Sequence, residues 1–145
     1  MFPATVARVL GTLIVRVQRQ SWNLRRCPME CTMTQAPEWS CTITLRLEYD
    51  ANGDVYASQK TEWFGETLRN KSDVEIWLRR AQAAILCPHM NSNEFHNKSK
   101  EDLEQLRKSD KRMMECLKNT MHIDVKDPHV TSLSFVDLPG GVAWP

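Results

Sequence analysis

Between residues 41 and 64, apolar and polar side chains alternate in two runs that a turn separates. One side of the first run carries its apolar positions, which are Cys41, Ile43, Leu45, Leu47 and Tyr49. A period of two residues is typical of a half-buried β-strand. Residues 50–54 contain an Asn-Gly pair, which supplies the positive φ angles that a tight reversal requires. The pattern therefore predicts a β-hairpin whose second strand covers residues 55–64.

The apolar positions change to a helical period after residue 72. The resulting stripe consists of Val74, Trp77, Leu78, Ala81 and Ile85. Ser72 and Glu75 have the spacing of a capping box, so we expect the helix to begin at Ser72, and Pro88 ends it. A second, strongly charged helix is expected to turn Leu103 and Leu106 inward.

The last third of the chain returns to strands. Apolar residues occupy every second position of residues 121–125, and a reversal at 126–129 leads into a denser apolar run at 133–136. Strands, then helices, then a strand pair favour an α/β architecture built in layers over a helical bundle or a β-sandwich.

The first 26 residues form a basic segment with an apolar stripe. The stripe consists of Val6, Val9, Leu10, Leu13, Ile14 and Val17, and the segment contains arginines but no acidic residue. Such a pattern is typical of an organelle presequence or of a helix that lies on a membrane surface. An arginine-rich stretch that falls into helical register by chance gives the same pattern, so the alternatives stay open.

Composition narrows the range of partners. Nineteen basic and eighteen acidic side chains give a formal net charge of +1. No overall field is available to hold duplex nucleic acid, so we expect no nucleic-acid partner. The chain also has no apolar run near the roughly 20 residues that span a bilayer, so we expect no transmembrane segment.

The cysteines favour neither disulfides nor a zinc site. Five cysteines, an odd number, are scattered along the chain without a secretory leader, which indicates reduced thiols in the cytoplasm. Cys27 and Cys31 are four residues apart and Cys87 lies two before His89, but zinc sites pair tighter spacings with a second matched pair. The histidines lack a partnered serine or cysteine in a recognisable nucleophile motif, so we assign no catalytic residue.

The sharpest chemical signal is at residues 133–140, which read Leu-Ser-Phe-Val-Asp-Leu-Pro-Gly. An apolar strand delivers Asp137 at its carboxyl end, and Gly140 follows three residues later. Nucleotide hydrolases use such an aspartate to hold Mg²⁺, usually through water, and the glycine lets a backbone amide approach the γ-phosphate. The contact is lost when that phosphate leaves, and the following loop relaxes. Taken alone, Asp-x-x-Gly also fits a strand that ends in an ordinary turn.

Four segments, taken in order and spacing, resemble the GTPase domain of fungal dynamin-like proteins. They are residues 26–31, 71–82, 123–128 and 133–140. The resemblance implies a partial P-loop GTPase fold, with a mixed β-sheet flanked by helices. It implies GTP and Mg²⁺ as ligands, with Asp137 and Gly140 as the second switch and Asp137 as the water-mediated magnesium ligand. It also implies GTP hydrolysis in a family that self-assembles on membranes and remodels them, with a cytoplasmic or membrane-associated location.

Several family elements do not match. The chain has no Gly-x-x-x-x-Gly-Lys-Ser/Thr loop, and its early Gly11 lacks both the second glycine and the lysine. Leu24 and Arg25 stand where the family has its magnesium-binding threonine. Residues 70–73 spell the guanine-reading pattern Asn-Lys-x-Asp, but they precede the Asp-x-x-Gly strand, whereas the family element follows it. We therefore expect Ser72 to cap a helix there.

These observations divide the chain into a divergent segment 1–25, a partial dynamin-type G domain 26–140 and a divergent tail 141–145. We expect the first strand and the phosphate loop of the family fold to be missing, as in a truncated product. We also expect the fragment to be weak or inactive toward GTP. The alternative is a non-catalytic interaction module, whose helix at 72–86 and neighbouring strands dock on intact dynamin relatives.

Overall fold

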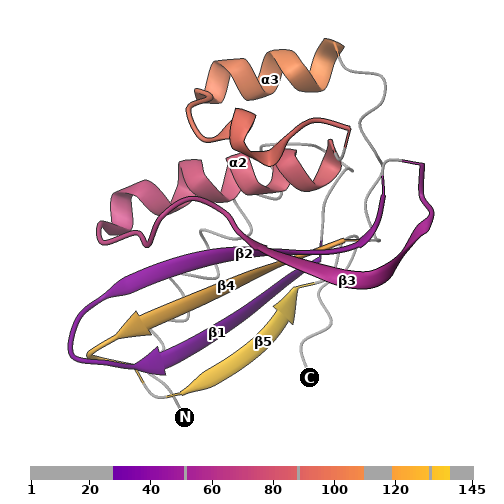
Figure 1. Cartoon of the computed structure of the whole chain (residues 1–145). Helices are drawn as coiled ribbons and strands as arrows, with labels where there is room; N and C mark the ends of the chain where they lie inside the picture. The colour runs from indigo at the N-terminus through magenta and orange to yellow at the C-terminus, as the bar shows by residue number, and fades with distance from the viewer. Residues whose placement is uncertain (1–27, 51, 88, 110–118, 131, 138–145) are drawn as a thin grey trace.

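A mixed β-sheet carries two α-helices on one of its faces in the part of the chain that the computed structural model describes, residues 28–50, 52–87, 89–109, 119–130 and 132–137 (Figure 1). The strands are β1 (Met29–Gln35), β2 (Ser40–Tyr49), β3 (Val55–Trp63), β4 (Thr120–Asp127) and β5 (Leu133–Asp137). The helices are α2 (Val74–Leu86) and α3 (Lys100–Ser109), with short 3-10 turns at Lys71–Asp73 and Ser92–Phe95. The predicted α/β class is confirmed.

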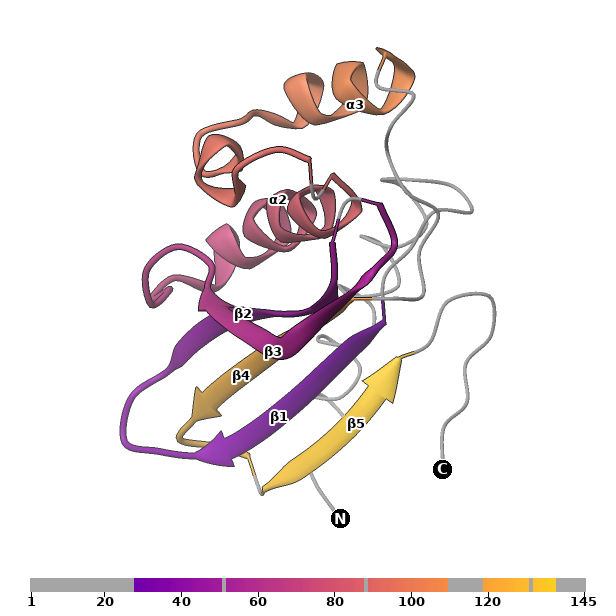
Figure 2. The same cartoon turned by 45° about the vertical axis from the view of Figure 1, so that its right-hand side comes forward.

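The strands pair in the order β3-β2-β4-β1-β5 (Figure 2). β1 and β4 are parallel, while the β1–β5, β2–β4 and β2–β3 pairs are antiparallel. Parallel neighbours need a long crossover, and the segment that contains β2, β3 and both helices supplies it. β3 and β5 are the two edges of the sheet among the described residues.

The core lies between the sheet and α2. Alternate residues of the three central strands point toward the helix and are almost fully buried: Met29, Cys31, Met33, Cys41, Ile43, Leu45, Met121, Ile123 and Val125. The helix contributes the predicted stripe, in which Val74, Leu78, Ala81 and Ile85 are buried and Trp77 is partly buried. α3 packs on α2 rather than on the sheet and buries Leu103.

The predicted hairpin is confirmed. The Asp50 carboxylate accepts hydrogen bonds from the backbone N–H groups of Asn52, at 2.8 Å, and Asp54, at 3.0 Å. Gly53 adopts φ +84°, the left-handed region that glycine enters without steric cost. Loop chemistry thus sets the start of β3, where Val55 lies opposite Tyr49, and the register then shifts before Lys60 pairs with Leu47.

The prediction that Ser72 caps the first helix was wrong. Asn70 caps the 3-10 turn, since its Oδ1 accepts from the Ser72 backbone N–H at 3.0 Å and from the Ser72 hydroxyl at 2.8 Å. α2 begins at Val74, and Asp73 at its N-cap makes no capping side-chain bond. Glu75 accepts from Arg79 at 3.0 Å. The Asn-Lys-x-Asp pattern at residues 70–73 therefore serves as a helix entry.

The predictions from sequence do not include β1, although its buried residues Met29, Cys31 and Met33 alternate with polar ones. It lies between β4 and β5, so it joins the two strands predicted in the last third of the chain. None of the described helices has the length and apolar character needed to cross a membrane.

Candidate functional site

Asp137, the predicted second-switch residue, is the last residue of β5. Its backbone pairs with Met29 at the start of β1, in the antiparallel register that continues to Leu133 opposite Met33. Its side chain and the whole of Gly140 lie outside the described residues. The prediction that a strand delivers this aspartate at its carboxyl end is confirmed, and the magnesium role stays a prediction.

The described parts of three of the four segments that carry the dynamin resemblance lie side by side. Residues 26–31 run into β1, residues 123–128 belong largely to β4, and residues 133–140 begin with β5. β1 pairs with β4 on one side and with β5 on the other. The fourth segment, 71–82, begins with the 3-10 turn and forms the first part of α2, which packs on the sheet.

The sheet face opposite α2 carries a charged cluster of Glu30, Arg46 and His122. Arg46 Nη1 donates to Glu30 Oε2 at 2.7 Å, and Arg46 Nη2 lies 3.3 Å from His122 Nδ1. The three residues come from β1, β2 and β4, and each is partly buried. Because both charges of the ion pair are satisfied within the cluster, it crosslinks three strands and leaves little unpaired charge for a ligand.

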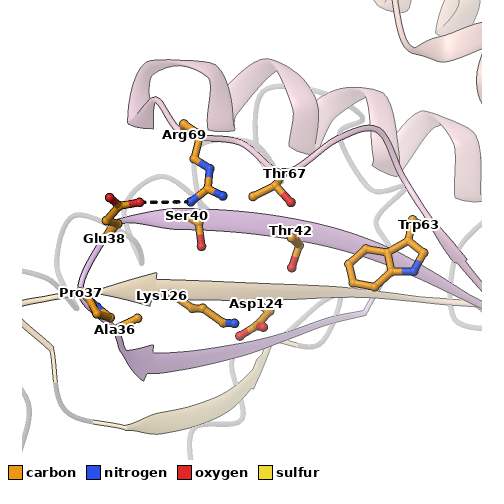
Figure 3. A pocket seen from close by; sticks show the side chains of 10 residues that line it. All are labelled: Ala36, Pro37, Glu38, Ser40, Thr42, Trp63, Thr67, Arg69, Asp124 and Lys126. Carbon is orange, nitrogen blue, oxygen red and sulfur yellow. Dashed lines mark ion pairs between the residues drawn. The ribbon is translucent and has the colours of Figure 1, made fainter.

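A pocket of about 570 Å³ opens on the same face, toward the start of β2 (Figure 3). It is lined by Ala36, Pro37, Glu38, Ser40, Thr42, Trp63, Thr67, Arg69, Asp124 and Lys126. Glu38 and Arg69 face each other across 4.0 Å at its rim, and both are largely exposed. Trp63 forms one end of the pocket and is 71% exposed. The lining is therefore polar and carries both signs of charge.

This pocket lies toward the opposite end of the sheet from Asp137. Ser40 and Lys126 line the pocket and pair with each other near the carboxyl end of β4. Asp137 pairs with Met29, and Met29 pairs with Met121 near the amino end of β4. β5 runs antiparallel to β1 and β4, so its carboxyl end lies at the end of the sheet where β1 and β4 begin. The pocket and the backbone of Asp137 thus lie at separate places in the sheet.

Sequence reasoning did not find the pocket. Thr42 and Asp124 sit at polar positions of alternating strands, and such positions are ordinarily just solvent-facing. Their cross-strand pairing brings together residues 82 positions apart. Only the β2–β4 register, which periodicity does not encode, places them in one surface.

The thiols of Cys31 and Cys41 are poor nucleophiles and poor metal ligands. Burial raises the pKa of both Cys31 and Cys41 to about 12, and the negative charge of Asp124 adds to the effect. Cys31, Cys41 and Cys87 are buried. Within the described ranges, histidine, cysteine and acidic side chains do not gather in groups of three that could hold a metal ion. Cys27 lies outside those ranges.

Comparison with known proteins adds no relative. A scan against protein-family models finds no match to the chain, and a search of curated proteins finds none either.

Proposed function

We propose that this chain carries part of a dynamin-type GTPase domain, in which Asp137 and Gly140 form the second switch and Asp137 holds Mg²⁺ through water. One observation carries the proposal: β5 is an edge strand that ends at Asp137 and is paired through β1 with the other strand segments of the dynamin-like pattern. An aspartate at the carboxyl end of a strand is the arrangement by which α/β nucleotide-binding proteins hold Mg²⁺ and phosphate.

The proposal implies a position for a phosphate-loop strand. Such a strand must have its carboxyl end beside that of β5, because the loop and the aspartate contact the same magnesium and phosphate groups. It must therefore run parallel to β5. Among the described strands, β5 pairs with β1 alone, so its other side is the place for that neighbour.

The chain by itself should bind GTP weakly. The 145 residues contain no phosphate-loop sequence, so several charge-assisted hydrogen bonds to the phosphates are lost. Each is worth about 1.5–3 kcal/mol, and the combined loss carries a micromolar site beyond about 1 mM.

A nuclear magnetic resonance titration of the 145-residue protein with Mg–GTP tests the proposal. At millimolar ligand we expect amide shifts confined to residues 137–140 and their β1 neighbours. Asp137→Ala should abolish these shifts, while the matched control Asp124→Ala, in the separate pocket, should preserve them. Shifts that cluster around Thr42 and Asp124 would show the proposed site to be wrong. Calorimetric binding tighter than about 10 µM would refute the weak-binding expectation.

The second candidate function is non-catalytic docking on an intact dynamin relative, and the feature that favours it is the side of β5 with which no described strand pairs. An unpaired strand edge is a template for pairing with another chain. Co-purification of a full-length dynamin-like GTPase with the tagged protein, reduced when Ser134 is replaced by proline, would support docking at β5. A protein that is recovered without such a relative would count against it.

A further inference from the structure

The pocket of about 570 Å³ lies at the end of the sheet where α/β proteins ordinarily receive ligands. β1 ends at Gln35, and the next three residues line the pocket. β4 is parallel to β1 and contributes Asp124 and Lys126 close to its own carboxyl end. Ligands of open α/β sheets bind in the crevice outside the carboxyl ends of the strands. The volume of the pocket is also within the range of small-molecule sites, about 300–1,000 Å³.

An irregularity at the edge of the sheet shapes one wall of this pocket. The Phe64 N–H donates to the Ile43 carbonyl at 2.8 Å, while Leu68 and Cys41 exchange backbone hydrogen bonds at 2.8 and 2.9 Å. Between these contacts β2 has one residue, Thr42, whereas the opposite segment has three. Bulges of this kind re-aim side chains and are frequent next to functional sites.

Side chains on both sides of the bulge border the pocket. Trp63 precedes the bulge and stands at one end of the pocket, and Thr67 and Arg69 follow the bulge along its upper wall (Figure 3). The Trp63 side chain is 71% exposed, so a large apolar ring stands in water beside polar groups. A ligand that covers this ring removes apolar surface from water, which favours binding.

The floor of the pocket offers hydrogen-bonding groups from two paired strands. Ser40 pairs with Lys126, and Thr42 pairs with Asp124. Two hydroxyls, an ammonium group and a carboxylate therefore line the same stretch of the sheet face. Thr42 and Asp124 are partly buried, and hydrogen bonds in such surroundings are stronger than in bulk water.

The charges that line the pocket balance. Glu38 and Asp124 are acidic, and Arg69 and Lys126 are basic. A phosphate or a polycarboxylate is attracted by an excess of positive charge, and equal numbers of the two signs give no such excess. A neutral ligand with several hydroxyls instead finds both hydrogen-bond donors and acceptors in this lining.

We propose that the pocket binds a neutral saccharide, with a C–H face of a sugar ring on the Trp63 indole and its hydroxyls on the floor. A pyranose has an apolar face and an edge of hydroxyls, so one ring covers the tryptophan and bonds to Thr42 and Asp124 together. The pocket is open and Lys126 is exposed, so we expect weak binding, with a dissociation constant on the order of 0.1–10 mM. Saccharide binding here does not depend on the role proposed for Asp137.

A nuclear magnetic resonance titration of the full 145-residue protein with four neutral disaccharides tests the site. The probes are maltose, cellobiose, mannobiose and diacetylchitobiose. We expect at least one of them to shift the Trp63 indole N–H together with the amides of Thr42, Thr67 and Asp124. Trp63→Ala should weaken that sugar at least about 10-fold, whereas Trp63→Phe keeps a ring and should stay within about 3-fold of the parent. Val55→Ala removes an equally exposed apolar side chain from the other end of β3 and should leave binding unchanged.

A second pair of variants tests the hydroxyl contact on the floor. Thr42→Val removes one hydroxyl at nearly constant shape and should weaken the sugar about 3- to 10-fold. Thr44→Val is the matched control, because Thr44 lies on the same strand and face but outside the lining of the pocket. Valine suits a β-strand, and thermal melting establishes that each variant folds.

Three outcomes would overturn the proposal. One is the absence of shifts with all four sugars up to about 50 mM. Another is equal sugar affinity in Trp63→Ala and Val55→Ala, or in Thr42→Val and Thr44→Val. The third is a shift of the same amides by inorganic phosphate or glycine betaine at lower concentrations than by any of the sugars, which would indicate a site for an anion or a zwitterion.

Discussion

At the scale of single residues, Gly65 holds the chain where β3 turns back toward α2. Its φ is +74°, and a Cβ built on it would lie 2.5 Å from Cζ3 of Trp77. Trp77 in turn packs edge-on against Phe64 and lies near the His96 ring. The absence of a side chain at Gly65 therefore lets an aromatic cluster close over the end of the sheet.

Gly65→Ala should destabilise the protein by about 2–4 kcal/mol, because left-handed strain adds to a steric clash with a ring that its neighbours hold in place. Urea denaturation measures the change. In the double variant Gly65→Ala, Trp77→Leu the clash is relieved, so the added cost of the alanine should shrink to about 1 kcal/mol. A single-variant cost below about 0.5 kcal/mol would contradict the close approach of glycine and ring.

At the scale of elements, Asn119 ties the start of β4 to the irregular end of β2. Its Oδ1 accepts hydrogen bonds from the backbone N–H groups of Glu48 and Tyr49, at 2.8 and 3.0 Å, and its Nδ2 donates to the Tyr49 carbonyl at 3.2 Å. The register of β2 shifts between Leu47 and Tyr49, and Asn119 is only 3% exposed. The Asn119 side chain thus forms hydrogen bonds with the backbone groups of Glu48 and Tyr49 at the register shift.

Asn119→Ala should cost about 2–3 kcal/mol, since it leaves buried backbone donors without their partner. Asn119→Asp keeps the accepting oxygen and should cost less, although it loses the bond to the Tyr49 carbonyl. Hydrogen exchange provides the local readout: the Glu48 and Tyr49 amides should lose protection in the alanine variant and largely retain it in the aspartate variant. Equal loss in both would show that the accepting oxygen is unimportant.

The sequence predicted a helix or strand correctly where a single local hydrophobic period determines it. The alternation from Cys41 to Tyr49 and the stripe from Val74 to Ile85 needed no distant partner, and both elements formed as predicted. The start of α2 was misassigned because Asn70 and Ser72 are both good capping residues, and only the intervening 3-10 turn decides between them. No strand was predicted at β1, although apolar and polar residues alternate there as regularly as in β2.

Strand order and the pocket were beyond local reasoning. The position of β1 between β4 and β5 depends on partners about 90 to 110 residues away in the chain. The pocket depends in the same way on the pairing of Thr42 with Asp124. Asp137 was found from the sequence because one short strand and its end carry the whole signal, whereas a surface assembled from several strands leaves no such mark.

At the scale of the whole molecule, two buried thiols make stability depend on alkaline pH. Cys31 and Cys41 lie on the helix-facing side of the sheet, and burial raises the pKa of each from 9.0 to about 12. The folded protein therefore keeps these protons over a range in which the unfolded chain releases them. Their contribution to stability is complete below pH 9 and is lost as the pH rises from 9 toward 12.

We expect the free energy of unfolding to fall across this range by up to about 1.4 kcal/mol per pH unit for each thiol. Denaturation at a series of pH values measures the slope. The informative quantity is the difference in slope between the parent and the double variant Cys31→Ala, Cys41→Ala, because contributions common to both proteins cancel in it. The variant is less stable near neutral pH because it loses core volume, but its alkaline slope should be shallower. Parallel slopes in the two proteins would mean that the thiols ionise as readily in the folded protein as in the unfolded chain. The packing of α2 over them would then have to be looser than the buried core described above.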